Sequence, residues 1–154
     1  GADCTPVLIA APDSGSVAAC HAGWRGVAAG ILTTAISQLE ASGCRREQLL
    51  VALGPAVSGP NYQVERSTSE QLGPIDDLQA AGALLDDPQE GRDRLDIRRA
   101  AHWQLLQFGL RTEQISICPL CTVAEPELFH SWRRDQVKAV QWSGIVSQNA
   151  DTPR

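Results

Sequence analysis

PVLIAAPDSGSVAACH, residues 6–21, holds two short apolar runs on either side of a turn signal. The apolar residues 6–11 predict a buried strand, and residues 16–21 predict a second strand. Residues 12–15, Pro-Asp-Ser-Gly, are typical of a turn between strands. The stretch therefore predicts a β-hairpin near the start of the chain.

Two longer segments after this hairpin have the apolar spacing of helices. Apolar residues repeat at helical spacing over residues 27–39 and over residues 97–108. Gly43 and Gly109 follow these segments and are suitable helix ends. A third, shorter helix is predicted for residues 65–72.

The remaining patterns predict strands and one irregular segment. Further strands are expected at residues 49–53, 62–64, 115–118 and 137–147. Residues 73–93 are acidic and weakly patterned, which predicts an exposed excursion with a helical turn at 77–85. Together the elements predict one α+β domain over residues 1–154, a mixed β-sheet core flanked by helices.

Composition and charge exclude several classes of protein. Of the 154 residues, 43% are hydrophobic and 20% are charged, which suits one compact domain with a core of its own. No apolar run is long enough to cross a bilayer, so no membrane partner is expected. The formal net charge of −5 argues against a nucleic-acid partner.

The five cysteines are odd in number and irregularly spaced, which does not suggest a disulfide framework. We therefore expect reduced cysteines and a cytoplasmic protein. The sequence contains no Met and opens at Gly1. We expect the chain to be the C-terminal part of a longer protein whose N-terminal segment is absent.

Cys4 and His21 are the first candidates for chemistry. Cys4 lies just before the first predicted strand, and His21 lies at the end of the second. Pairing of the strands would bring them together at one end of the sheet. A thiolate and an imidazole suit either zinc binding or a nucleophile–base pair. A structural cysteine and a structural histidine are the alternative.

Residues 23–26, Gly-Trp-Arg-Gly, follow His21 and precede a predicted helix. Gly23 and Gly26 allow close approach of a ligand to the backbone. Arg25 and the start of the helix together suit a phosphate or carboxylate. Trp24 suits stacking on a base, and packing in the core is its alternative role. A solvated Arg25 on the surface is the alternative to an anion site.

Several blocks of residues carry a resemblance to a known family. They are residues 2–7 (ADCTPV), 21–26 (HAGWRG), 54–57 (GPAV), 121–122 (CT) and 129–135 (FHSWRRD). These blocks occur in the order seen in the YfiH-like proteins, long labelled laccase-domain or polyphenol oxidases. The resemblance covers nearly the whole chain and implies the α+β fold of that family.

The resemblance implies a zinc-dependent purine nucleoside phosphorylase with adenosine deaminase activity. Its partners would be a purine nucleoside and phosphate. Cys4 and His21 match two zinc ligands of the family, and the third lies upstream in a Gln-Val-His-Gly motif that this sequence lacks. The implied catalytic residues are Cys4, His21 and Arg25. The implied substrate-binding residues are Gly23, Trp24, Gly26 and Arg133.

Three other functions stay open at this point. One is a hydrolase or acyl-transfer enzyme with Cys4 as nucleophile and His21 as base. A second is copper-dependent phenol oxidation, although three histidines are few for a multicopper site. The third is an inactive binding domain.

Other potentially reactive residues have a structural interpretation. Cys118 and Cys121 form a lone C-x-x-C, which predicts a structural role, although Cys121 is a candidate to line the pocket. His102 is expected to be at the surface or half-buried, and His130, which lies in one of the blocks shared with the family, is a weak candidate for a substitute metal ligand. The adjacent Arg133 and Arg134 suit an anion patch, and the alternative is a solvated edge or a structural ion pair with Asp135.

Overall fold

A mixed four-stranded sheet forms the centre of the molecule. The computed structural model describes residues 1–147. The sheet contains β1 (Thr5–Ala11), β2 (Ser16–Ala22), β3 (Leu50–Leu53) and β7 (Ile115–Ile117), in the order β2-β1-β3-β7. β1 pairs antiparallel with β2 and β3, and β3 pairs parallel with β7. The predicted hairpin and the mixed sheet are therefore confirmed.

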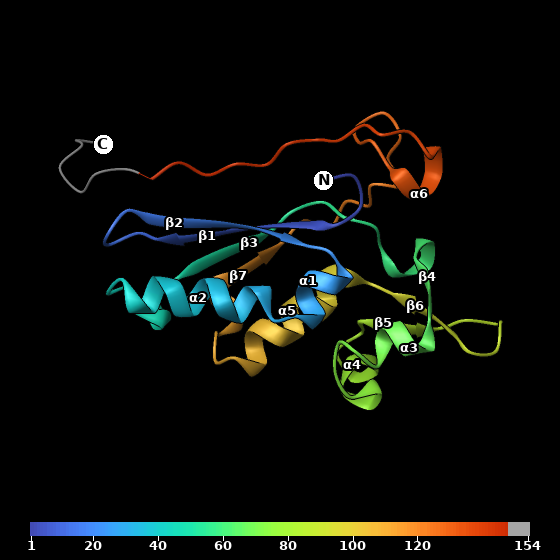
Figure 1. The fold of residues 1–154 in the computed structure, drawn as a ribbon, viewed down its shortest axis with the longest axis horizontal. Coiled ribbons are helices and arrows are strands. Elements are labelled where there is room, and N and C mark those ends of the chain that lie inside the picture. Colours follow the sequence, from blue (N-terminus) through green and yellow to red (C-terminus); the bar gives the residue numbers. More distant parts are fainter. Residues whose placement is uncertain (148–154) are drawn as a thin grey trace.

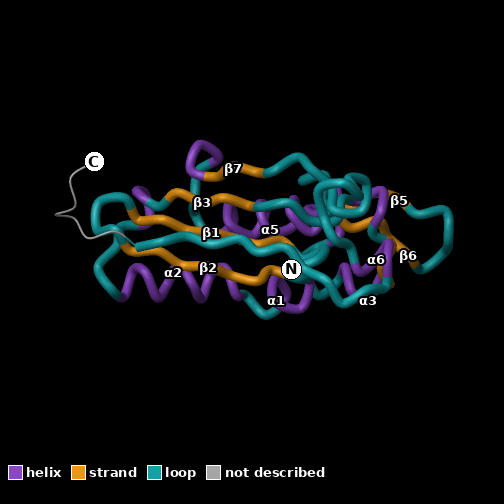
Figure 2. Tube along the Cα trace, turned by 90° about the horizontal axis from the view of Figure 1, so that it is seen from above, coloured by secondary structure: helices purple, strands orange, loops and turns teal. Residues whose placement is uncertain are grey.

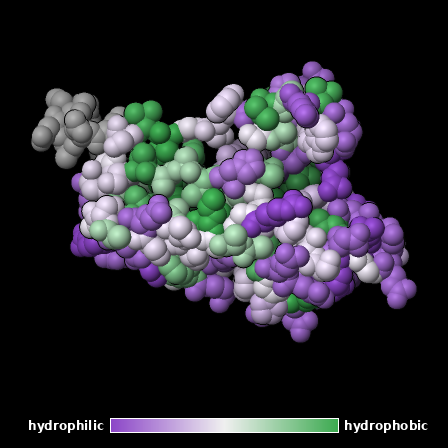
Figure 3. Space-filling view, in the orientation of Figure 1, coloured by the Kyte–Doolittle hydropathy of each residue, from purple (hydrophilic) through white to green (hydrophobic). Residues whose placement is uncertain are grey.

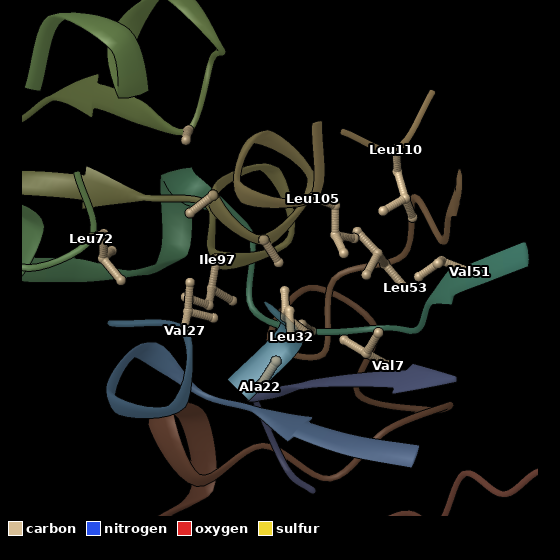
Figure 4. Packing of buried hydrophobic residues seen from close by; sticks show 14 of the residues in the cluster. Val7, Ala22, Val27, Leu32, Val51, Leu53, Leu72, Ile97, Leu105 and Leu110 are labelled. Atoms are coloured by element: carbon tan, nitrogen blue, oxygen red, sulfur yellow. The ribbon is translucent and has the colours of Figure 1, made fainter. Parts of the chain in front are cut away.

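Helices cover one face of this sheet (Figure 1). They are α1 (Trp24–Ala28), α2 (Ile31–Ala41) and α5 (Ile97–Gln107). Alternate residues of β1, such as Val7 and Ile9, point toward them and are fully buried. Figure 4 shows Val7, Leu53, Leu32 and Leu105 packed in this layer. The core therefore lies between the sheet and the helices.

The predicted helix over residues 27–39 is broken in two. α1 ends at Ala28, and α2 begins at Ile31 after Gly30, whose φ of 73° lies in the left-handed region. A side chain adopts that conformation at a cost, but glycine does so readily. The apolar spacing alone did not reveal this break.

A second, smaller sheet lies beside the first (Figure 1). It contains β4 (Gln63–Glu65), β5 (Leu84–Asp86) and β6 (Arg92–Leu95) in the order β4-β6-β5. Two short helices, α3 (Arg66–Ser69) and α4 (Ile75–Ala80), accompany it. The exposed excursion expected at residues 73–93 is therefore wrong in part, since this stretch contains α4 and β5 and buries Leu78 and Leu84.

Three 3₁₀ turns complete the connections. They are η1 (Arg46–Gln48), η2 (Gly59–Asn61) and η3 (Thr112–Gln114). Each lies just before a strand, where it turns the chain into the sheet.

Within residues 1–147 no helix is long and apolar enough to span a membrane.

The strand predicted for residues 137–147 is wrong. After α6 (Trp132–Asp135) the chain runs as an extended segment along β1 and β2, on the face of the sheet opposite the helices (Figures 1 and 2). Gly1 and Gln141 exchange two backbone hydrogen bonds of 2.9 and 3.0 Å. The segment lies over the face of the sheet and not beside an edge strand, so it adds no strand to the sheet.

The sheet face beneath this segment is apolar. Leu8 and Ala10 of β1 lie opposite Ala52 and Leu50 of β3, and half of Leu50 is exposed. Figure 3 shows hydrophobic residues gathered on this side of the molecule. A sheet face that meets water is normally polar, so this one has the composition of a covered face.

A buried ion pair fixes the loop that follows β7. The carboxylate of Asp96 caps α5 by accepting from the backbone N–H groups of Arg98 and Arg99, and it also binds the buried guanidinium of Arg98 at 3.2 Å. Arg98 in turn donates to the carbonyls of Cys118 and Leu120, each at 2.8 Å. Helix start and loop are therefore held by one charge pair.

We expect Asp96→Ala to lower the free energy of unfolding by about 3 kcal/mol, because it removes a helix cap and leaves the Arg98 charge buried without its partner. Urea unfolding followed by circular dichroism measures the change. Asp13→Ala is the matched control, since Asp13 pairs with Arg45 in an exposed bridge that is worth about 0–1 kcal/mol. Equal losses in the two variants would contradict this account of Asp96.

Candidate active site

The hairpin brings Cys4 and His21 to the same end of the sheet. Cys4 directly precedes β1, and His21 pairs with Pro6 near the end of β2. A Cβ placed on Gly23 would lie 2.7 Å from Cys4 Sγ and 3.9 Å from His21 Nε2. A side chain at Gly23 would therefore collide with the Cys4 thiol, so glycine at this position lets the thiol and the His21 ring approach the same part of the backbone.

A thiol and an imidazole this close together suit a metal ion that prefers sulfur and nitrogen. Zinc takes ligands of both kinds, and a side chain at Gly23 would fill the position beside them. Within residues 1–147, no group of three or more His, Cys, Asp or Glu side chains converges in this way. Cys4 and His21 thus fit part of a zinc ligand set, and further ligands would have to come from elsewhere.

Burial raises the pKa of the Cys4 thiol, and the nearby charge of Asp3 raises it further. The reactive form of a cysteine nucleophile is the thiolate. The raised pKa keeps Cys4 protonated near neutral pH when no cation is bound. Its surroundings therefore do not activate it as a nucleophile, but a metal ion would displace the proton.

Asp3, next to Cys4 in the chain, holds three distant groups. Its carboxylate accepts from the hydroxyls of Thr122 and Ser131 at 2.7 and 2.8 Å and from the backbone N–H of Arg133 at 2.8 Å. Both hydroxyl residues are buried. The hydrogen bonds tie the start of the chain to the region of α6, which places Arg133 beside Cys4.

A pocket of about 320 Å³ opens beside Cys4. Its lining includes five of the seven predicted site residues, namely Cys4, Gly23, Trp24, Arg25 and Arg133, but neither His21 nor Gly26. The remaining lining was not predicted as part of the site and comprises Ala2, Asp3, Val57, Tyr62, Ile97 and Trp132. Buried Val57 and Ile97 make part of this lining apolar, while the two arginines bring positive charge.

Each of the two arginines lies over an aromatic ring. The Arg25 guanidinium is 4.3 Å from the centre of the Trp24 ring, and that of Arg133 is 4.8 Å from the centre of the Tyr62 ring. Neither forms a salt bridge with a carboxylate in the described part of the chain. Arg134, by contrast, binds Asp135 at 2.6 Å, so only one of the two adjacent arginines forms the ion pair that the sequence allowed. Stacked guanidinium groups without a carboxylate partner are suited to binding an anion.

Two predictions about the anion site need correction. α1 has five residues and begins at Trp24, so no long helix points its free N–H groups at the pocket. Gly26 does not line the pocket. A Cβ there would lie 3.1 Å from the carbonyl oxygen of His21, so Gly26 is required for close backbone packing. Of the features predicted to bind an anion, the structure retains the positive charge of Arg25 and Arg133 at the pocket.

Cys121 lies outside the lining of this pocket. It is buried and accepts a hydrogen bond from the backbone N–H of Ser58 at 3.3 Å. Burial alone would raise the pKa of this thiol, but hydrogen bonds from Ser58, Ala124 and Val123 outweigh burial and lower it. Its backbone forms a bridge with Ala56, which supports the structural role predicted for the C-x-x-C.

The other two histidines lie on separate elements from His21. His102 is on α5, where burial and then the charge of Arg99 lower its pKa. His130 is exposed just before α6.

Sequence spacing could not have shown that Tyr62 and Trp132 reach the pocket, because their spacing from Cys4 follows no helical or strand pattern.

A mixed sheet with helices on one face, and a Cys/His pair beside an arginine-bearing pocket, define an α+β protein of the YfiH type. YfiH of Bacillus licheniformis superimposes with a TM-score of 0.80 and 31% identity, over 88% of this chain and 51% of that one. YlmD of Geobacillus stearothermophilus gives 0.79 and 30%, over 88% and 50%. Residues 1–147 match the family described as multi-copper polyphenol oxidoreductase laccase, and the chain belongs to that family.

Curated relatives carry the name purine nucleoside phosphorylase. One from Synechocystis is 42% identical over 95% of this chain, and one from Bacillus subtilis is 32% identical over 94%. The chain spans 61% and 52% of the lengths of these two relatives. The resemblance drawn from the sequence blocks is thereby confirmed at the level of the family and its fold.

We expect Asp3→Ala to lower the free energy of unfolding by about 3 kcal/mol, because two buried hydroxyls and one N–H lose their acceptor. Hydrogen exchange at the Arg133 amide should also become faster. Asp3→Asn should lie between the wild type and Asp3→Ala, since an amide oxygen still accepts from the two hydroxyls. Unchanged exchange at Arg133 in Asp3→Ala would contradict the role given to this carboxylate.

Proposed function

We propose that this chain is part of a zinc-dependent purine nucleoside phosphorylase with adenosine deaminase activity. One observation carries the proposal: Cys4 Sγ and His21 Nε2 both lie close to Gly23, beside a pocket with two arginines that pair with no carboxylate of residues 1–147. The names of the relatives support the phosphorylase activity. We place the enzyme in the cytoplasm, in keeping with its five free cysteines.

The pocket suits a nucleoside together with an anion. In phosphorolysis a phosphate oxygen bonds to C1′ of the ribose while the bond from C1′ to the base nitrogen breaks, and the base leaves with a proton. Arg25 and Arg133 would bind the phosphate and orient it toward C1′. Trp24 and Trp132 offer aromatic surface for the base.

Cys4 and His21 would hold the zinc ion. Zinc supplies Lewis acidity, which activates water for attack on C6 of adenine in deaminases of this general kind. Asp3 fixes the chain next to Cys4, and the lack of a side chain at Gly23 lets the Cys4 thiol and the His21 ring come close to each other. The Asp3 contacts and the glycine at position 23 both belong to this chain.

The alternatives have weaker support from the site. A Cys4 nucleophile needs a lowered thiol pKa, but burial and Asp3 raise it. Copper, as the alternative cofactor, is named in the family description, but a multicopper site needs many histidines, and His21, His102 and His130 lie on separate elements.

We expect Cys4→Ala or His21→Ala, made in the intact natural protein, to remove bound zinc and to lower phosphorolysis and adenosine deamination by at least about 100-fold. Residues that only support metal ligands already contribute about 10–100-fold. Metal analysis and chromatography of the released base measure the two effects. Cys20→Ala is the matched control, because Cys20 precedes His21 but packs against the core on the other face of β2.

Full zinc content and turnover in either variant would reject the metal assignment. Turnover that survives chelation but is lost on alkylation of Cys4 would favour the hydrolase instead. Stoichiometric copper with phenol oxidation in the purified protein would favour the oxidase.

A further inference from the structure

Tyr62 lies at the start of the smaller sheet, and its backbone is fixed on both sides. Its N–H donates to the carbonyl of Gly59 at 3.1 Å, and its carbonyl accepts from the N–H of Leu95 at 2.9 Å. It follows η2 and precedes β4, so its ring projects from a short, hydrogen-bonded connection. The ring is half-buried and forms part of the pocket lining.

Arg133 of α6, which is far from Tyr62 in the sequence, packs against this ring. Its backbone N–H is held by the Asp3 carboxylate at 2.8 Å, and its guanidinium lies 4.8 Å from the centre of the Tyr62 ring. The arginine is therefore fixed at both ends of its side chain, by a hydrogen bond at the backbone and by stacking at the guanidinium. No carboxylate of residues 1–147 forms a salt bridge with it, so its donors stay available.

Burial raises the pKa of the Tyr62 phenol, although the charge of Arg133 opposes this rise. The phenol is neutral at physiological pH. A neutral aromatic ring attracts a cation through its negative face, and guanidinium groups stack well on such rings. The contact holds Arg133 in place without neutralising its charge, as a carboxylate would.

We propose that Tyr62 is a positioning residue that holds the Arg133 guanidinium in the pocket in the orientation that binds phosphate. This inference rests on the proposed function, which it extends by assigning Arg133 to the phosphate and Tyr62 to the support of Arg133. A free arginine side chain loses considerable rotamer freedom when it binds an anion, and stacking restricts that freedom beforehand. Removal of the ring should therefore weaken phosphate binding more than nucleoside binding.

The test compares Tyr62→Leu, which removes the ring, with Tyr62→Phe, which keeps it. In the zinc-loaded intact protein, Tyr62→Leu should raise the KM for phosphate about tenfold, in the range expected for a cation–π contact, and should change the KM for inosine less than twofold. Tyr62→Phe should restore the wild-type KM for phosphate. Calorimetric titration with inorganic phosphate should show the same order of affinities.

Phe108→Leu is the matched control. Arg46 lies 4.2 Å from the centre of the Phe108 ring, a similar stacked pair at the opposite end of α5 from Ile97 and the pocket. This variant loses an aromatic ring and a cation–π contact without touching the pocket. Its phosphate affinity should equal that of the wild type.

A second approach avoids any variant of Tyr62 that fails to fold. Arg133→Lys keeps the charge but loses the planar stacking, so it should also weaken phosphate binding about tenfold. Tyr62 is the only tyrosine of the chain. After selective ¹³C labelling of tyrosine in the intact protein, the Tyr62 ring signal is assigned by its loss in Tyr62→Phe, and it should shift on addition of phosphate to the wild type but not to Arg133→Met.

The outcomes separate this inference from the proposed function. Phosphorolysis by the wild type with equal phosphate affinity in Tyr62→Leu, or with no shift of the tyrosine signal, would overturn the role of Tyr62 alone. Phosphate binding that depends on Tyr62, in a protein that cleaves no nucleoside, would support this role and reject the phosphorylase. A parallel rise of both KM values would indicate general damage to the pocket and contradict a specific role in phosphate binding.

Discussion

Thr122, Ser131 and the backbone of Arg133 all donate hydrogen bonds to one carboxylate, that of Asp3. These groups are more than 100 positions away from Asp3 in the chain. Because Cys4 is the next residue, the same contacts fix the candidate metal ligand and the candidate anion ligand relative to each other. Asp3 and Arg133 both line the pocket beside Cys4, so this carboxylate helps to position its wall.

The distribution of charge separates structural from available arginines. Arg98 is buried against Asp96, and Arg134 binds Asp135 and three backbone carbonyls. Arg25 and Arg133 instead lie on aromatic rings at the pocket and form no salt bridge within residues 1–147. A carboxylate partner would hold these side chains as firmly but would compete with an anionic ligand, whereas an aromatic ring leaves their charge available.

The face of the central sheet that lies away from the helices is apolar, and the end of β2 leaves His21 exposed. The residues of this face, including Leu8, Ala10 and Leu50, are apolar, and the extended segment of residues 137–147 runs along this side. His21, at the end of β2, is exposed close to Gly23. The candidate metal site is thus accessible in the described residues, in contrast to the buried core between sheet and helices.

Local patterns in the sequence determined the hairpin, α2, α5 and the approach of Cys4 to His21. These features depend on alternation, helical spacing and a turn, all of which act between near neighbours in the chain. The same patterns missed β5 and misassigned residues 137–147, because a three-residue strand has little alternation and an apolar segment can pack on a face instead of joining a ladder. Only the tertiary structure decided that Asp3, Tyr62 and Trp132 meet at the pocket, since hydrogen bonds and stacking between distant segments leave no periodic signal in one sequence.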